Sequence, residues 1–235
     1  MSYTVTREDI LSLRADAAVL CVENKMVVAE SAVCVRLAEA GGEALRAALR
    51  RKKFLPVGSA DALGEDVRPL PRLILVATPH WNNAQSNELL ILRYCYRDVF
   101  RVAEEMGCRS VVMPFLSAYY YRFPREDAVH AGLAEAEKCG LRVTFAAEDQ
   151  ELLELSRRPY RKAEIREYIG YYRDDAIFSL DNGQYIRVDI RPEKNDVAKI
   201  IYFEPYYRLE HDPKQTPLPT QEIDRLKSLY YSCDW

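Results

Sequence analysis

The residues best placed for chemistry lie in one loop, residues 114–124, with the sequence Pro-Phe-Leu-Ser-Ala-Tyr-Tyr-Tyr-Arg-Phe-Pro. An apolar run precedes the loop at residues 110–116, and a helical pattern follows it at residues 124–138. A strand, a loop and a helix start in that order favour an anionic ligand, because the first turn of a helix has free N–H groups. Phosphate-binding loops usually contain glycine, which lets the backbone approach the ligand. The position of the loop predicts an anion site, but its composition does not.

Several side chains in this loop have two possible roles. Ser117 either binds a phosphate or caps the following turn. Arg122 has the geometry to hold a phosphate through two hydrogen bonds. Tyr119, Tyr120 and Tyr121 either stack on a base or fill and reshape the pocket, and the second interpretation is the one the bulk of these side chains favours.

Other chemistries lack their motifs. The sequence has no glycine-rich loop ending in Gly-Lys-Ser/Thr, no G-x-G-x-x-G and no G-x-S-x-G. Its six cysteines are scattered without a C-x-x-C pair, several of them inside apolar segments. Neither a zinc site nor a disulfide framework is predicted, and no cofactor is implied.

Charge and hydropathy restrict the partners. The formal net charge of −3 gives no whole-chain attraction to nucleic acid. No apolar run approaches the length of about 20 residues that crosses a membrane. The first residues lack the basic and apolar regions of a signal peptide. We therefore expect a cytoplasmic protein with neither a membrane nor a nucleic acid as its partner.

The elements that position the loop alternate between strands and helices. Apolar runs predict strands at residues 2–6, 17–22, 73–77, 110–116 and 141–147, and helical periodicity predicts helices at residues 30–40, 43–53, 86–106, 124–138 and 151–156. This alternation is typical of a mostly parallel sheet covered by helices on both faces. The predicted fold of residues 1–158 is a three-layer α/β/α domain.

Composition changes near residue 159, where tyrosine and charged residues become frequent and glycine becomes rare. The remainder, residues 159–235, is predicted to form a small α+β extension. Its expected elements are a helix, a hairpin closed by Asp-Asn-Gly, a further strand and a terminal helix, at residues 161–172, 176–190, 198–203 and 220–229.

Five segments carry a further signal through their order along the chain: Asp9-Ile10 with Asp16-Ala-Ala-Val, Pro56-Val-Gly-Ser-Ala, Leu70-Pro71 with Leu73-Ile-Leu-Val-Ala-Thr-Pro79, Leu92-Arg-Tyr-Cys-Tyr, and the loop of residues 114–124. Taken in order, they resemble the macro domain, an ADP-ribose-binding α/β module, over about residues 3–149. The resemblance implies that Asp9 and Ile10 lie beside the adenine, although Asp9 serves equally well as a cap. It also implies that the loop of Ser117, Ala118, Tyr119, Tyr120, Tyr121 and Arg122 contacts the ligand.

The sequence departs from this family at the implied ligand positions. The glycines of the first ligand loop are absent from residues 24–33, where Asn24 lies at or beside the asparagine of the family. Cys34 stands where hydrolytic members have an acidic residue, and we predict it to be a buried helix cysteine. Glu148 stands where the family has an aromatic residue that stacks on adenine.

The resemblance thus implies a divergent macro domain that binds ADP-ribose, a related nucleotide or an ADP-ribosylated protein, and the missing acid at Cys34 argues against catalysis. Two alternatives stay open. One is a degenerate scaffold with a filled pocket that contacts a protein partner, for example through the C-terminal extension. The other is an ADP-ribosyl-protein hydrolase with a remodelled site, in which Asn24 positions a water molecule.

Overall fold

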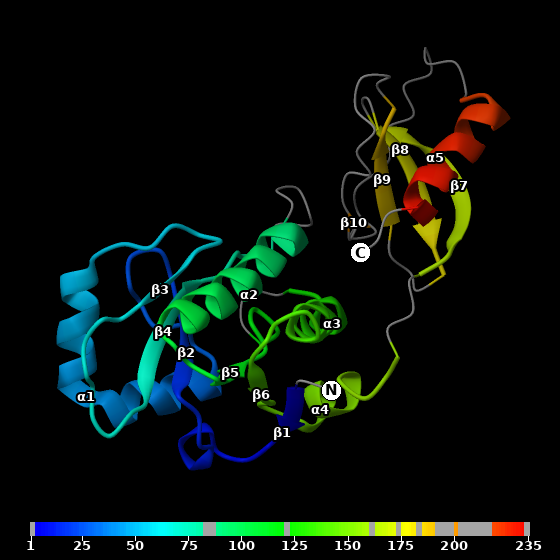
Figure 1. Ribbon diagram of the computed structural model, residues 1–235. Coiled ribbons are helices and arrows are strands. Elements are labelled where there is room, and N and C mark those ends of the chain that lie inside the picture. Colours follow the sequence, from blue (N-terminus) through cyan, green and yellow to red (C-terminus); the bar gives the residue numbers. More distant parts are fainter. Residues whose placement is uncertain are drawn as a thin grey trace. The chain divides into compact units, whose positions relative to one another are not determined.

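The computed structural model describes residues 3–81, 88–119, 123–159, 163–172, 175–181, 185–190, 200–201 and 218–232. These residues belong to two compact units (Figure 1). The first comprises Met1–Trp81 and Glu88–Pro159, and the second holds Tyr160–Trp235. The division into an α/β/α domain at residues 1–158 and an α+β extension at residues 159–235 stays a prediction. No helix in the described ranges is long and apolar enough to cross a membrane.

The first unit is built on a six-stranded sheet with the order β1-β6-β5-β2-β4-β3. Its strands are β1 (Tyr3–Thr6), β2 (Ala17–Val22), β3 (Ala60–Ala62), β4 (Arg72–Ala77), β5 (Ser110–Pro114) and β6 (Arg142–Ala146). Neighbouring strands are parallel, except that β3 runs antiparallel to β4. The short edge strand β3 was not predicted, because three residues show no periodicity.

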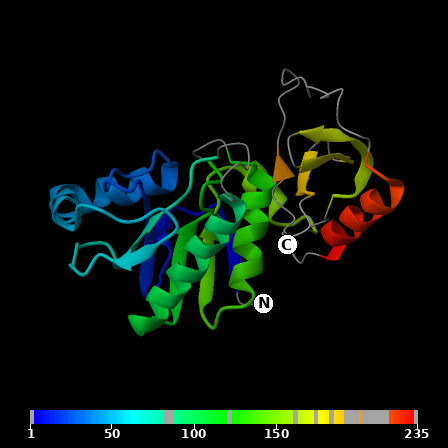
Figure 2. The same ribbon diagram turned by 90° about the horizontal axis from the view of Figure 1, so that it is seen from above.

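Helices cover both faces of this sheet and give the predicted three-layer α/β/α fold. They are η1 (Ile10–Ser12, a 3₁₀ turn), α1 (Ala32–Lys52), α2 (Glu88–Glu105), α3 (Arg125–Ala136) and α4 (Gln150–Leu155). Figure 2 shows α1 on one side of the sheet and α2 with α3 on the other. All six residues of β2 are buried, because this central strand has helices on both faces.

The two helices predicted at residues 30–40 and 43–53 are one helix, α1, with a kink between them. Gly42 has φ 53° and ψ −142°, a conformation open mainly to glycine. The predicted glycine break is therefore real, but the chain continues as a helix beyond it. Asp149 caps α4, since its carboxylate accepts a hydrogen bond from Leu152 N at 3.0 Å.

Between the central strands β2 and β5, the connections that follow the strands lead in opposite directions along the sheet. From β2 the chain passes through α1 to β4, and from β5 it passes through α3 to β6, on the other side of β2. Because parallel crossovers are right-handed, opposite directions place α1 and α3 on opposite faces. A crevice for a ligand is expected at the carboxyl ends of strands at such a switch point.

The described residues of the second unit form a four-stranded antiparallel sheet with the order β10-β9-β8-β7, and one helix. Its elements are β7 (Ile165–Tyr172), β8 (Asp175–Leu180), β9 (Tyr185–Asp189), β10 (Ile200–Ile201) and α5 (Thr220–Ser232). Leu226 and Tyr230 of α5 pack with Phe178 and Val188 in a separate core.

The helix predicted at residues 161–172 is wrong, because Ile165–Tyr172 forms strand β7 against β8. Tyrosine and isoleucine favour strands, and Tyr168 packs on Phe178 with ring centroids 5.4 Å apart. Pairing with β8 decides the structure here. The Asn-Gly pair of the predicted hairpin turn, and most of the strand predicted at residues 198–203, lie outside the described residues.

Candidate functional site

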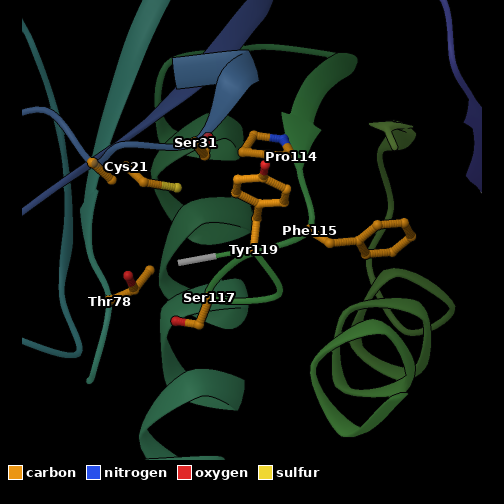
Figure 3. Close-up of a pocket in the computed structure, with 8 residues that line it drawn as sticks. Cys21, Ser31, Thr78, Pro114, Phe115, Ser117 and Tyr119 are labelled. Atoms are coloured by element: carbon orange, nitrogen blue, oxygen red, sulfur yellow. The ribbon is translucent and has the colours of Figure 1, made fainter. Parts of the chain in front are cut away.

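A small pocket opens at the carboxyl ends of β2, β4 and β5 (Figure 3). The residues that line it are Cys21, Ala29, Ser31, Thr78, Pro114, Phe115, Ser117 and Tyr119. Its accessible volume is about 10 Å³, which is room for about one water molecule. The pocket lies between β2 and β5, at the switch point of the sheet.

The Tyr119 side chain lies at the rim of this pocket. Figure 3 shows its ring beside Pro114, directed into the pocket from the loop that follows β5. The side chain remains 54% exposed, so it narrows the pocket without being part of the core. The predictions for Tyr120, Tyr121 and Arg122 lie outside the described residues.

Ser117 and Ala118 form the turn that carries Tyr119. Ser117 is buried in a left-handed conformation with φ 59°, which is uncommon for a residue other than glycine. Its hydroxyl donates a hydrogen bond to the Pro79 carbonyl at 3.3 Å, and Ala118 N donates to the Phe115 carbonyl at 3.3 Å. The Ser117 hydroxyl thus ties the loop after β5 to the segment after β4.

Tyr96 of α2 fixes the start of the same loop. Its buried hydroxyl accepts a hydrogen bond from Leu116 N at 2.7 Å and lies 3.5 Å from the Ala128 carbonyl of α3. Burial raises the pKa of Tyr96 well above the usual value, so the hydroxyl stays protonated. A helix that the sequence already predicted therefore fixes the start of the loop that follows β5, which we call the pocket loop.

Replacing Tyr96 by phenylalanine should lower the free energy of unfolding by about 1–3 kcal/mol, because the buried Leu116 N–H loses its acceptor. Urea denaturation measures the loss, and faster amide exchange at Leu116 would locate it. Tyr94→Phe is the matched control, since Tyr94 lies on the same helix and is 49% exposed. Equal stability of the two variants would contradict this role of Tyr96.

The N-terminus of α1 reaches the pocket through Ser31. The Ser31 hydroxyl oxygen accepts a hydrogen bond from Cys34 N at 3.1 Å and caps the helix. Glu148, which follows β6, accepts one from Ala32 N at 3.0 Å. Burial raises the pKa of Glu148, and the nearby donors of Ser31, Ala32 and Val33 offset only part of the rise.

Glu148 as a partner of α1 was missed by the sequence interpretation, which noted only that it cannot stack on a base. Residues 32 and 148 are 116 positions apart, so no local pattern links them. The sequence did contain a usable signal. Glu148 follows the buried strand β6 and α1 follows the buried strand β2, so both lie at the edge formed by the carboxyl ends of the parallel strands. Cys21 and Thr78 were likewise not predicted as pocket residues.

Three of the predicted ligand residues, Asp9, Ile10 and Asn24, lie outside the lining of the small pocket. Asn24 is exposed in a turn, and its carbonyl accepts a hydrogen bond from Leu55 N at 3.0 Å. Asp9 caps η1 through Leu11 N and forms an ion pair with Arg36 at 2.7 Å. Ile10 belongs to the core. None of these three residues lines the small pocket.

Cys34 is fully buried on α1, as predicted for a helix cysteine. Interaction with Cys21, the β2 residue that lines the pocket, lowers the pKa of the Cys34 thiol, although burial opposes this shift. A buried thiol offers no carboxylate for the activation of water. Among the described residues, no group of three or more histidine, cysteine, aspartate and glutamate side chains is arranged to hold a metal ion.

Comparison with known proteins agrees with this architecture. The family model for the macro domain matches residues 23–132. A macro domain-containing protein of Streptomyces coelicolor is 32% identical over 131 residues, which is 53% of this chain and 76% of that protein. The O-acetyl-ADP-ribose deacetylase 1 of Pantoea vagans is 26% identical over 140 residues, or 58% of this chain and 81% of that enzyme.

Solved structures show the same fold. The Oceanobacillus iheyensis macrodomain with ADP superposes with a TM-score of 0.58 at 17% identity, covering 66% of this chain and 87% of that one. The Trypanosoma brucei macrodomain in complex with ADP-ribose gives a TM-score of 0.56 at 19% identity, covering 66% and 67%. The chain belongs to the macro domain family.

Proposed function

We propose that the first unit binds ADP-ribose or a related nucleotide, free or attached to a protein, without hydrolysing it. The observation that carries this proposal is the position of the pocket at the switch point between β2 and β5. Residues from both predicted ligand loops, Ser31 and Ser117 among them, line it. Relatives crystallised with ADP and with ADP-ribose support the choice of ligand class.

The side chains at the pocket suggest how such a ligand would be held. Ser31, Thr78 and Ser117 supply hydroxyl groups, and Tyr119 supplies a half-exposed ring on which a base or a sugar can pack. The resemblance to the family adds Asp9 at the base, and Arg122 or Ser117 would hold the phosphates. Because the pocket itself has room for about one water molecule, most of the ligand would lie over its mouth.

Calorimetric titration of the full chain with ADP-ribose tests the proposal. We expect measurable binding, and Tyr119→Ala should weaken it about tenfold, since stacking of an aromatic ring on a base contributes about 1–3 kcal/mol. Tyr94→Ala is the matched control, because Tyr94 is an equally exposed tyrosine that lies on α2, outside the lining of the pocket. No heat at millimolar ligand from a well-folded sample would refute nucleotide binding.

Hydrolysis is the least supported version of this function. Cys34 occupies the position of the acidic residue of hydrolytic members and is buried, and Asn24 is an exposed turn residue outside the pocket lining. We expect no loss of label from a mono-ADP-ribosylated protein and no acetate release from O-acetyl-ADP-ribose. Turnover of either substrate, lost in Asn24→Ala, would instead establish the enzyme.

The size of the pocket favours a second function, a scaffold whose ligand site is filled. In this case the tyrosine-rich second unit would contact a protein partner. The scaffold predicts no heat with ADP-ribose from the intact chain, and a gain of binding rather than a loss in Tyr119→Ala. The titration described above therefore separates the two functions.

A further inference from the structure

The first turn of α1 offers backbone N–H donors beside the pocket, and the carboxylate of Glu148 occupies part of it. Ala32 N donates a hydrogen bond to Glu148 Oε2 at 3.0 Å. Cys34 N donates to Ser31 Oγ at 3.1 Å. Two backbone donors of this turn are thus satisfied within the chain.

Backbone N–H groups at a helix N-terminus commonly bind an anionic ligand from solution. The N-terminus of a long helix carries a partial positive charge and unsatisfied N–H groups, which together bind phosphate or carboxylate. In α1, a helix of 21 residues, the carboxylate of Glu148 provides that anion. Ser31 belongs both to this cap and to the lining of the pocket, so the carboxylate lies next to the proposed ligand site.

We propose that Glu148 is an intramolecular competitor that lowers the affinity of the first unit for anionic ligands at the N-terminus of α1. The inference rests on the proposed function, because the competing ligand is the diphosphate group of the nucleotide. An incoming phosphate must displace the carboxylate or share its donors, and a like charge at hydrogen-bond distance makes sharing costly. Glu148 is then a residue that determines specificity and sets the affinity of the site.

The surroundings of Glu148 show why its charge can be modulated. Asp149, the next residue, raises the pKa of Glu148 further, and Arg125 of α3 is engaged by Asp149 and Glu151. The thiols of Cys21 on β2 and Cys34 on α1 are the other ionisable groups that interact with it. A carboxyl with a raised pKa becomes neutral at a higher pH than usual. Anion affinity should therefore rise as the pH falls toward that pKa, above the ordinary value of 4.5.

The decisive variant is Glu148→Gln, which keeps the shape of the side chain and removes its charge. At pH 7.5 we expect this variant to bind ADP-ribose about tenfold more tightly than the unchanged chain, equal to about 1.4 kcal/mol. Its affinity should also no longer rise with falling pH. Glu154→Gln is the matched control, because Glu154 is an exposed carboxylate on α4, away from the α1 donors.

A second readout separates failure of this inference from failure of nucleotide binding. Inorganic pyrophosphate is titrated into the isotope-labelled full chain, and the backbone amide signals of Ala32, Val33 and Cys34 are followed. Pyrophosphate should shift these signals at lower concentration in Glu148→Gln than in Glu154→Gln or the unchanged chain, even if ADP-ribose gives no heat. Equal shifts in all three proteins, or unchanged ADP-ribose affinity in a folded Glu148→Gln, would overturn the proposal.

Discussion

Replacement of Phe145 by alanine is expected to lower the free energy of unfolding of the first unit by about 3–5 kcal/mol. Phe145 is fully buried in β6. Its ring stacks on Phe115 with centroids 4.5 Å apart and an angle of 5°, and it meets Tyr96 edge-on at 6.3 Å. Truncation would leave a cavity between three aromatic neighbours, counting Tyr3 at 6.3 Å.

The effect should extend to the pocket, because Phe115 both stacks on Phe145 and lines the pocket. Thermal and urea denaturation measure the stability, and hydrogen exchange followed by mass spectrometry assigns the loss to the first unit, since two units need not unfold together. Phe54→Ala serves as the control, because Phe54 is 57% exposed. If Phe145→Ala cost no more than Phe54→Ala, the aromatic cluster would not be the support of the loop.

The sequence predicted the central strands of the first unit well because they are buried on both faces. Continuous apolar runs, such as Ala17–Val22 and the run at residues 73–77, can be recognised from composition alone. Caps are also local, because a capping residue such as Asp149 directly precedes its helix in the sequence. Order along the chain then sufficed to locate the pocket loop at the end of β5.

The errors arose where the deciding contact is remote. The segment of strand β7 was predicted as a helix from the apparent periodicity of its side chains. It forms a strand because pairing with β8 outweighs that periodicity. The role of Glu148 at the start of α1 was not predicted, because its hydrogen bond with Ala32 N joins two segments that lie far apart in the sequence. Asp9 fits its local role as a cap, yet its ion pair with Arg36 of α1 is again long-range. Sequence patterns predict elements, whereas the polar contacts of a site depend on the assembled fold.

The second large effect is expected at Glu135, an α3 carboxylate with 3% of its surface exposed. It bonds Arg93 and Arg97 of α2 at 2.7 Å each. The side chain of Arg93 is 15% exposed, whereas that of Arg97 is 48% exposed. Glu135→Ala should therefore destabilise the first unit by about 3 kcal/mol, toward the lower end for a buried ion pair that loses one partner.

The pH dependence of this cluster has a definite sign. Burial raises the pKa of Glu135, but the hydrogen bonds from Arg97 and Arg93 lower it by more, so its pKa in the folded chain lies below the usual value. A carboxyl with a lowered pKa contributes stability above its unfolded pKa, and that contribution is lost as the pH falls through the folded pKa.

The difference in unfolding free energy between the unchanged chain and Glu135→Ala should accordingly be full at pH 7 and smaller at pH 3. Denaturation at both pH values measures it, with Glu105→Ala as the control, because the exposed Glu105 pairs only with the exposed Arg101 among the ion pairs described. A difference that does not change with pH would show that Glu135 acts through packing rather than through its charge. Both helices of this ion cluster adjoin the loop that follows β5: α2 through the Tyr96 hydroxyl, and α3 because the loop leads into Arg125–Ala136. If Glu135 acts through packing, the ion cluster and the aromatic residues around Phe145 both support this loop by packing.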